Sequence, residues 1–236
     1  MPTWHKIIFG DARNMREVPN EAVHLVVTSP PYFNAPFDFP DLFKDYDEYL
    51  DLIKTVGKEL YRVLEKGRVA CFVVQDVRIG GKLYPIVSDI THIMVYEVGF
   101  NYPYPMYYYP DNIYEEVIIF QKGKFDYSKV PSHLKKRSKI DINRFQSEKW
   151  YLSVWNITNV LPTDKLSKFT AVYPENLVME MLGRVELKDG DLILDPFAGT
   201  GTTAAVVNKI RNSLYTKRIY SVMIEKGHEF VNIIKD

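Results

Sequence analysis

The sequence predicts one α/β domain built on a doubly wound, largely parallel sheet. Short β-branched runs alternate with longer stretches of helical periodicity. Several of these runs, such as VVTS, ACFVV and LILD, are apolar without alternation, as expected of strands that are covered on both faces. A chain of 236 residues is long enough for one sizeable core, so we expect a single domain over residues 1–236.

Five strands and four helices are expected. The strands are Leu25–Thr28, Val69–Val74, Glu116–Phe120, Leu192–Leu194 and Ile219–Ile224. The clearest helix runs from about Tyr46 to Leu64, because its apolar residues fall on one stripe and Gly67 follows as a stop signal. The other helices are expected to begin near Pro85, Pro174 and Thr202.

Positive charge gathers in a segment that lacks periodicity. Between about residues 122 and 161 the chain becomes polar and basic, which predicts an insertion outside the core sheet. The segment Lys122–Lys149 holds nine Lys or Arg against three Asp or Glu, whereas the whole chain has no net charge. The rest of the chain is therefore acidic.

Composition excludes several classes of protein. The single Cys71 allows no internal disulfide and no cysteine-based zinc cluster, and the five histidines show no metal-ligand spacing, so no metal is implied. No run approaches the roughly 18 apolar residues of a membrane span, and the amino terminus does not resemble a signal peptide. We expect a cytoplasmic protein without a membrane partner.

A glycine-rich turn follows the expected strand at residues 192–194. It reads Asp195-Pro196-Phe197-Ala198-Gly199-Thr200-Gly201-Thr202-Thr203 and leads into a helical stretch. Glycine lets a ligand approach the backbone closely, and the free amides at a helix start favour an anionic group such as a carboxylate. The turn lacks the Lys of a phosphate-binding loop and the spacing of a dinucleotide fingerprint, which disfavours a triphosphate or NAD. A turn that serves only packing is the alternative.

A second motif, Thr28-Ser29-Pro30-Pro31-Tyr32, directly follows the buried run HLVV. The prolines remove two backbone donors, so the carbonyls of Ser29 and Pro30 and the Ser29 hydroxyl can accept hydrogen bonds from an amino group. Tyr32 offers a ring on which a base can stack, an interaction worth roughly 1–3 kcal/mol in single-strand binders. The alternatives are a surface turn or a proline-rich ligand for another protein, and the buried run in front argues against both.

Together the two motifs resemble those of the DNA amino-methyltransferases, and the resemblance covers nearly the whole chain. In that family a Ser-Pro-Pro-Tyr or Asp-Pro-Pro-Tyr loop holds the target amine and a Phe-x-Gly-x-Gly loop holds S-adenosylmethionine. The order of the loops is similar to the permuted arrangement called the beta class. The resemblance implies an S-adenosylmethionine-dependent DNA methyltransferase with catalytic residues Ser29, Pro30, Pro31 and Tyr32.

The resemblance also implies a set of cofactor-binding residues. Asp11 resembles the family's acidic contact to the cofactor adenine, and Glu225 resembles the acid that binds the cofactor ribose. Lys168 begins a stretch similar to the one that flanks the cofactor, although the family often has His where Phe169 stands. The implied cofactor-binding residues are Asp11, Lys168, Asp195, Pro196, Phe197, Ala198, Gly199, Thr200, Gly201, Thr202 and Glu225.

The implied reaction methylates the exocyclic amine of a base swung out of the duplex, because the amine cannot be reached within the stack. Hydrogen bonds from the amine to Ser29 Oγ and a proline-flanked carbonyl would favour direct transfer by positioning and electrostatics. Cys71 lies in an apolar run, which predicts a core thiol and no nucleophile. The family's cytosine-N4 members usually have Ser at the first loop position and its adenine-N6 members more often Asp or Asn, so Ser29 favours N4 of cytosine.

Double-stranded DNA is the expected partner, and a cognate restriction endonuclease is a second candidate. The expected DNA-binding residues lie in the basic insertion, at about residues 122–161, and are Lys135, Lys136, Arg137, Lys139 and Arg144. The aromatic run Phe100–Tyr109, which we expect between core strands, is a further candidate. Such basic residues mainly bind phosphates, so they leave the target sequence open.

Other interpretations of the same residues stay open. The target could be N6 of adenine, or an amine of RNA or protein. The chain could also be an inactive DNA-binding module that has kept the fold. A dehydrogenase is disfavoured, because no hydride-transfer constellation accompanies the glycine turn. The oligomeric state is not readable from the sequence.

Overall fold

The computed structural model describes residues 5–35, 41–108, 115–123, 154–155, 173–183, 185, 187–212, 218–228 and 230. These residues form an eight-stranded sheet and a separate hairpin. In sheet order its strands are β1 (His5–Phe9), β10 (Tyr220–Glu225), β9 (Leu192–Asp195), β2 (Val23–Thr28), β3 (Leu64–Val74), β7 (Glu115–Gln121), β6 (Asn101–Tyr108) and β8 (Val154–Trp155). The hairpin pairs β4 (Val77–Ile79) with β5 (Lys82–Tyr84).

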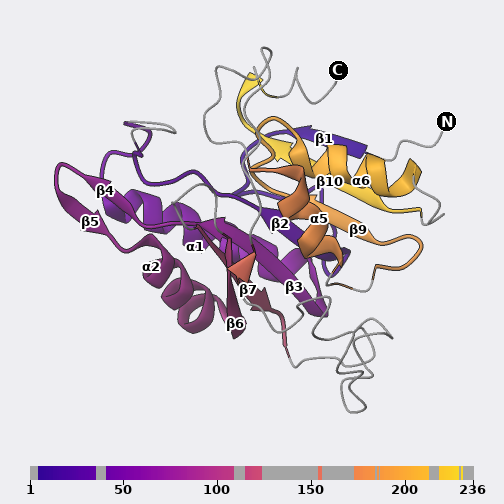
Figure 1. Ribbon diagram of the computed structural model, residues 1–236, viewed down its shortest axis with the longest axis horizontal. Coiled ribbons are helices and arrows are strands. Elements are labelled where there is room, and N and C mark those ends of the chain that lie inside the picture. The colour runs from indigo at the N-terminus through magenta and orange to yellow at the C-terminus, as the bar shows by residue number, and fades with distance from the viewer. Residues whose placement is uncertain are drawn as a thin grey trace.

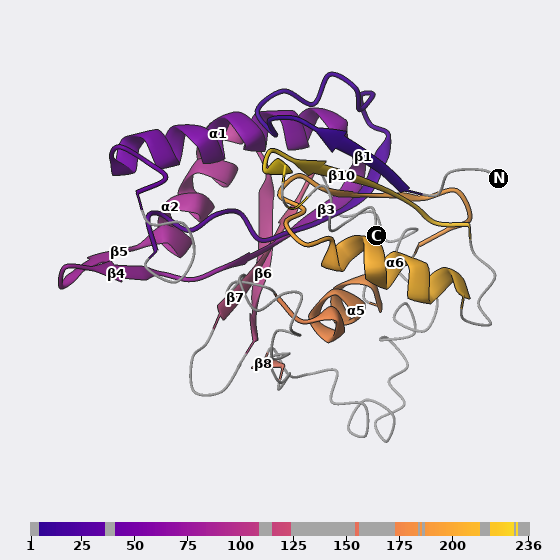
Figure 2. The same ribbon diagram turned by 90° about the horizontal axis from the view of Figure 1, so that it is seen from above.

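Helices cover both faces of the sheet, as the two views of Figures 1 and 2 show. One face carries α1 (Tyr46–Val63), α2 (Ile86–His92) and the π-helix η1 (Ile93–Val98), and the other carries α5 (Glu175–Gly183) and α6 (Thr202–Asn212). Strands β1, β10, β9, β2 and β3 run parallel, and β7 is antiparallel to both its neighbours. The predicted doubly wound, largely parallel sheet is therefore confirmed.

Strand β2 explains why the core strands read as unbroken apolar runs. Val26 packs in the cluster of side chains on the α1 face, whereas Leu25 and Val27 pack in the cluster on the α5 and α6 face. All three side chains are fully buried. Because successive side chains of a strand point to opposite faces, a strand covered on both sides needs apolar residues at every position.

Helix α1 forms where its apolar stripe predicts, and it ends one residue earlier than expected. The side chain of Asp45 caps its start by accepting a hydrogen bond from the Glu48 amide at 2.9 Å. Leu64 already has extended backbone angles and begins β3. Gly67 therefore does not stop the helix. It lies inside β3 with a φ of 84°, where the pairing of β3 with β2 changes register.

We expected the aromatic run at residues 100–109 to lie between core strands, but most of it is itself a strand of the sheet. Residues 101–108 form β6, which pairs with β7, and the register shifts between Asn101 and Tyr104. Strand β1 and the β4–β5 hairpin were also not expected. The five expected strands are all present, each extended by at least one residue at one end or moved by one.

Two strands that lie far apart in the sequence meet at the centre of the sheet. Strand β9 pairs with β2, although about 170 residues separate them. The helix after β9 lies on one face and the helix after β2 lies on the other. Doubly wound folds bind ligands at the carboxyl ends of strands where the connections reverse in this way.

Most of the expected insertion lies outside the described residues, which within residues 122–161 are Lys122, Gly123 and strand β8. The structure thus leaves the single-domain boundary and the insertion as predictions. Within the part of the chain that is described, no helix has the length and apolar character needed to cross a membrane.

Candidate active site

The two motifs lie side by side at the carboxyl edge of the sheet. Residues 29–32, which the sequence predicts to be catalytic and which we call the catalytic loop, follow β2. The glycine turn, residues 196–201, follows β9. The two strands pair in parallel, with Leu25 opposite Ile193 and Val26 opposite Leu194. The two motifs, which are far apart in the sequence, are thus neighbours at this edge of the sheet.

Ser29 lies at the start of the catalytic loop with its hydroxyl hydrogen already engaged. Its Oγ donates a hydrogen bond to the Val73 carbonyl on neighbouring β3, at 3.2 Å. A hydroxyl has one hydrogen and two lone pairs, so this bond leaves the oxygen as an acceptor. Ser29 Oγ can therefore still accept a hydrogen bond, and its role toward a target amine stays a prediction.

Tyr32 is buried, with 4% of its surface exposed. Its ring packs in the core cluster on the α1 face, and its hydroxyl donates to Glu115 Oε1 on β7 at 3.2 Å. The expectation that this ring offers an open face to a base is not met in this structure, because core packing covers it. Burial also raises the pKa of Glu115.

The glycine turn has the open geometry that a ligand needs. Gly199 and Gly201 have φ angles of 49° and 85°, which side chains rarely adopt. A Cβ placed on Gly199 would meet no atom within 4 Å, so this position faces open space. The turn is closed by the Gly201 amide, which donates to the Ala198 carbonyl at 2.8 Å, and α6 begins at the next residue.

One acidic residue, Glu225, contacts this turn, and a second, Asp11, follows the neighbouring strand β1. Glu225, at the end of β10, accepts a hydrogen bond from the Gly199 amide at 2.8 Å through Oε2 and from the Gly227 amide at 2.7 Å through Oε1. Asp11 follows β1, which pairs with β10. Its side-chain hydrogen bond with Arg13 lowers the pKa of Asp11 to about 2. The Asp11 carboxylate is thus paired with Arg13, whereas Glu225 bonds directly to the turn.

These residues fit S-adenosylmethionine. The carboxylate of Glu225 accepts from the Gly199, Lys226 and Gly227 amides, which leaves one lone pair, on Oε2, that could accept from a ribose hydroxyl. The open space at Gly199 and the start of α6 could receive the carboxylate of the amino-acid part. The cofactor supplies an electrophilic methyl group on a sulfonium.

Asp195 lies fully buried between the two loops, and its carboxylate faces protein groups on every side that the structure describes. Oδ1 accepts from Thr28 Oγ1 at 3.0 Å and from the Phe197 amide at 3.2 Å. Oδ2 accepts from Thr203 Oγ1 at 2.7 Å and from the Tyr173 hydroxyl at 2.8 Å. Burial raises the pKa of Asp195, and these hydrogen bonds oppose the rise.

Three residues of this network are absent from the site that the sequence predicts. Thr28 belongs to the quoted motif without an assigned role, Thr203 follows the cofactor set, and Tyr173 lies in the stretch thought to flank the cofactor. Their shared signal is a polar side chain fully or partly buried next to a motif. Lys168 and the expected DNA-binding residues lie outside the described residues. Those are Lys135, Lys136, Arg137, Lys139 and Arg144.

Cys71 is a core thiol, as expected. Its side chain is buried on the α5 and α6 face of β3, and burial raises its pKa to about 12. A thiol with such a pKa stays protonated near neutral pH and is a poor nucleophile. Burial and the raised pKa thus argue against a nucleophilic role for Cys71.

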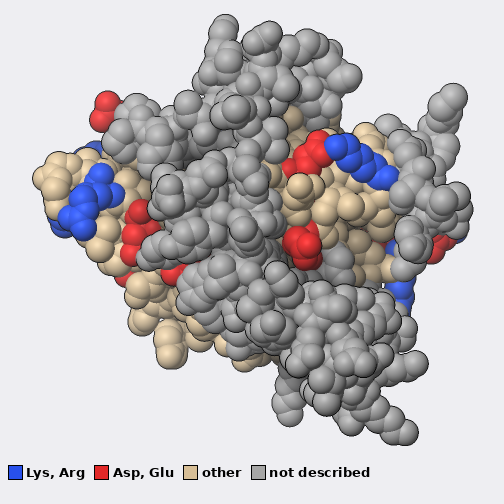
Figure 3. Space-filling model, in the orientation of Figure 1, with Lys and Arg blue, Asp and Glu red and all other residues tan. Residues whose placement is uncertain are grey.

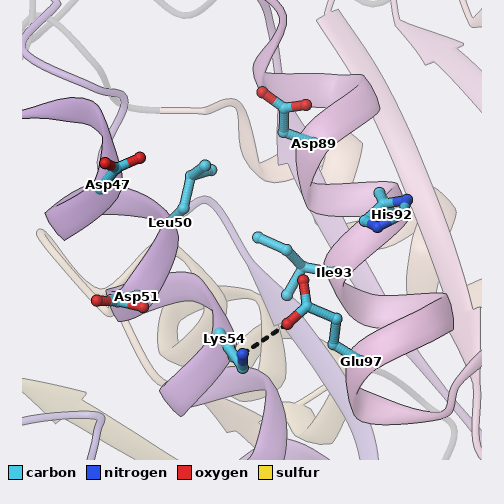
Figure 4. Close-up of a pocket in the computed structure, with 8 residues that line it drawn as sticks. All are labelled: Asp47, Leu50, Asp51, Lys54, Asp89, His92, Ile93 and Glu97. Carbon is cyan, nitrogen blue, oxygen red and sulfur yellow. Dashed lines mark ion pairs between the residues drawn. The ribbon is translucent and has the colours of Figure 1, made fainter.

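A pocket on the α1 face has a different character. Asp47, Asp51 and Lys54 of α1 line one side, and Asp89 and Glu97 line the other (Figure 4). The Lys54 ammonium lies 2.6 Å from Glu97. Carboxylates dominate this pocket, none of the motif residues line it, and such a surface repels phosphates. We therefore place the site at the carboxyl edge and not here.

Comparisons with known proteins identify the family of this chain. The N6_N4_Mtase family, described as DNA methylase, matches residues 23–236. The chain is 32% identical over 266 residues to the type II methyltransferase M.MjaI of Methanocaldococcus jannaschii, covering 90% of this chain and 86% of the relative. It is 32% identical over 251 residues to the type II methyltransferase M.MwoI of Methanothermobacter wolfeii, covering 98% of this chain and 34% of the relative.

A solved structure shows the same fold along nearly the whole chain. The DNA modification methylase TTHA0409 of Thermus thermophilus, determined in complex with S-adenosyl-L-methionine, matches with a TM-score of 0.70 and 25% identity, covering 98% of this chain and 91% of that one. The family match spans most of the sequence, including both loops. The chain therefore belongs to the N6/N4 DNA methylase family and is an S-adenosylmethionine-dependent DNA amino-methyltransferase.

Proposed function

We propose that this protein methylates N4 of cytosine in double-stranded DNA. The observation that carries the proposal is the Ser29 hydroxyl, whose hydrogen is donated to the Val73 carbonyl. The oxygen is left to accept from a target amine at the edge where the glycine turn also lies. Ser at this loop position resembles the family's cytosine-N4 members, whereas N6 of adenine is the second candidate target.

In the proposed reaction the residues of this chain position and polarise the amine. Ser29 Oγ and a proline-flanked carbonyl accept hydrogen bonds from the two N–H groups of the amine. These bonds reduce the conjugation of the nitrogen lone pair with the ring. Backbone carbonyls next to Pro30 and Pro31 suit this role, because proline has no N–H with which to tie the loop into the sheet. Positioning supplies most of the rate.

The proposed roles of the other predicted residues rest on the resemblance of their motifs to those of the family. Glu225 and Asp11 would bind the ribose and the adenine, and residues 196–202 would surround the amino-acid part. The basic residues at 135–144 would bind DNA phosphates. Two relatives bear type II names, which supports a modification role beside a restriction endonuclease as partner.

The first test identifies the methylated base. The protein is incubated with labelled S-adenosylmethionine and mixed-sequence duplex DNA, and the DNA is then digested to nucleosides for mass spectrometry. We expect N4-methylcytosine. N6-methyladenine would overturn the assignment of the base and the inference from Ser29, and labelled RNA or protein without labelled DNA would overturn the substrate class.

The second test isolates the hydroxyl. Ser29→Ala should lower kcat by about 10²-fold, the scale seen when one preorganised hydrogen bond to a reacting group is removed. The affinity for the cofactor should not change, because Ser29 follows β2 and lies outside the glycine turn. Ser29→Thr keeps a hydroxyl and serves as the matched control. Full activity of Ser29→Ala would exclude the proposed role.

A further inference from the structure

The two loops of the active site are joined by a hydrogen bond between side chains at the ends of their strands. Thr28 is the last residue of β2 and Asp195 is the last residue of β9. Thr28 Oγ1 donates to Asp195 Oδ1 at 3.0 Å, and both side chains are fully buried. The bond links residues that are 167 positions apart in the sequence.

The backbone does not make this connection. The last backbone-paired position of β2 and β9 is Val26 opposite Leu194. Thr28 lies two residues beyond that pair, and Ser29 is the next residue. The side-chain bond therefore ties the strand ends together where the ladder between these strands has ended.

Besides Thr28, Asp195 is bound to the glycine turn and to residues that flank it. Thr203 Oγ1 and the Tyr173 hydroxyl donate to Oδ2, and the Phe197 amide donates to Oδ1. A buried carboxylate with four donors is held in one orientation, since each donor comes from a different direction of the surrounding fold. Asp195 thereby fixes Thr28 relative to the glycine turn.

We propose that Thr28 and Asp195 are positioning residues that set the alignment of Ser29 with the cofactor during methyl transfer. The inference rests on the proposed function and names residues that act through Ser29 and the glycine turn. In-line transfer depends steeply on geometry, and a displacement of about 1 Å can reduce a rate by about 10²-fold. A fixed bond between the loops answers this need.

The test removes the bond and keeps the shape. Thr28→Val replaces the hydroxyl by a methyl group of similar volume and leaves Asp195 Oδ1 with the Phe197 amide. We expect kcat, counted per cofactor-binding site, to fall by about 10-fold to 100-fold, while the Kd for S-adenosylmethionine changes by less than about 3-fold. Thr28→Ser restores the donor and should recover most of kcat.

A matched control removes a threonine hydroxyl elsewhere. Thr91 Oγ1 donates to the Val87 carbonyl within α2, so Thr91→Val makes the same chemical change away from both loops. Thr91→Val should keep the kcat of the unmodified protein. If Thr28→Val lost kcat and Thr28→Ser failed to restore it, the loss would reflect packing, and the positioning role would be wrong.

The outcomes separate this inference from the proposed function. Unmodified protein that methylates DNA, together with a Thr28→Val variant of equal kcat, would overturn the positioning role and leave the function standing. Unmodified protein that binds the cofactor and methylates no DNA would overturn both. A parallel loss of kcat and cofactor affinity in Thr28→Val would assign Thr28 to the cofactor site and also exclude the inference.

Discussion

Glu115 connects the catalytic loop to the antiparallel part of the sheet. It accepts the hydrogen bond of Tyr32, and burial raises its pKa from the ordinary value of 4.5. Because the pKa is higher in the folded state than in the unfolded chain, Glu115 contributes stability at low pH. That contribution is fully present below the unfolded pKa and is lost as the pH rises through the folded pKa.

Glu115→Gln should therefore become more stable relative to the unmodified protein as the pH rises. Gln cannot ionise, yet its side-chain oxygen can still accept from Tyr32. The free energy of unfolding of both proteins would be measured with urea at about pH 4 and about pH 8. We expect the difference to favour Gln more at the higher pH.

Glu97→Gln is the matched control for this measurement. The hydrogen bond with Lys54 lowers the pKa of Glu97, so its contribution to stability is present above the unfolded pKa and is lost as the pH falls. The stability of Glu97→Gln relative to the unmodified protein should therefore fall as the pH rises. An equal effect of Glu115→Gln at both pH values would contradict the raised pKa of Glu115 in the folded state.

Helix α1 packs closely on η1 at Gly57, where a larger residue would require Met94 to shift. Gly57 of α1 is buried, and a Cβ there would lie 2.7 Å from Met94 Sδ and 3.1 Å from Val98 Cγ2. Glycine costs a helix about 1 kcal/mol relative to alanine. The close approach of the two helices explains why glycine is tolerated in the middle of α1.

Gly57→Ala should destabilise the protein despite its better helix propensity. Overpacking costs about 1–3 kcal/mol, and from the middle of that range upward this outweighs the gain in propensity of about 1 kcal/mol. In a Met94→Ala background the nearest obstacle is gone, so the same substitution should cost at least about 1 kcal/mol less. Urea unfolding of the unmodified protein, the two single variants and the double variant gives the coupling free energy between Gly57→Ala and Met94→Ala. Strictly additive effects would show that Met94 does not limit the size of the residue at position 57.

Sequence periodicity predicts a helix or strand well when its packing against neighbouring elements requires a regular pattern of apolar residues. Helix α1 has a single apolar stripe because one face meets the sheet, and its range was predicted to within one residue. Strand β6 was missed because Pro103 and Pro105 interrupt it, and proline normally argues against a strand. The structure places the register shift between Asn101 and Tyr104, around Pro103, so the ladder is already interrupted there.

The arrangement of the whole sheet is beyond local pattern. Both loops were predicted from their residue types, yet nothing in the sequence says that β9 inserts between β10 and β2. That placement depends on non-local pairing, which a single sequence does not encode as a period. The Thr28–Asp195 bond is a consequence of this pairing, so it could only be found once the strands were placed.

Charge is the remaining property of the whole molecule that bears on DNA binding. On the face in Figure 3 the described Lys and Arg form separate small groups, one of them over the β4–β5 hairpin. The basic segment 122–149 carries a net charge of +6 by sequence, from nine basic and three acidic residues. We therefore expect this segment to provide most of the phosphate contacts.

Replacing Lys135, Lys136 and Arg137 together by Gln should weaken DNA binding and reduce its dependence on salt. Each phosphate contact that is lost lowers the slope of log Kd against log salt by about 0.9, so the slope should fall by up to about 3. The Kd for S-adenosylmethionine should not change, because these residues lie outside the cofactor motifs. Titration of a labelled duplex at several salt concentrations measures the slope.

The matched control neutralises basic residues at the opposite edge of the sheet. Lys188 and Arg218 are exposed and precede β9 and β10, so they lie at the amino ends of strands whose carboxyl ends hold the loops. A Lys188→Gln and Arg218→Gln double variant should leave the salt slope unchanged, because DNA that reaches the loops does not contact that edge. If this variant lowered the slope and the triple variant did not, DNA would lie along the other edge, and a base could not reach Ser29 as proposed.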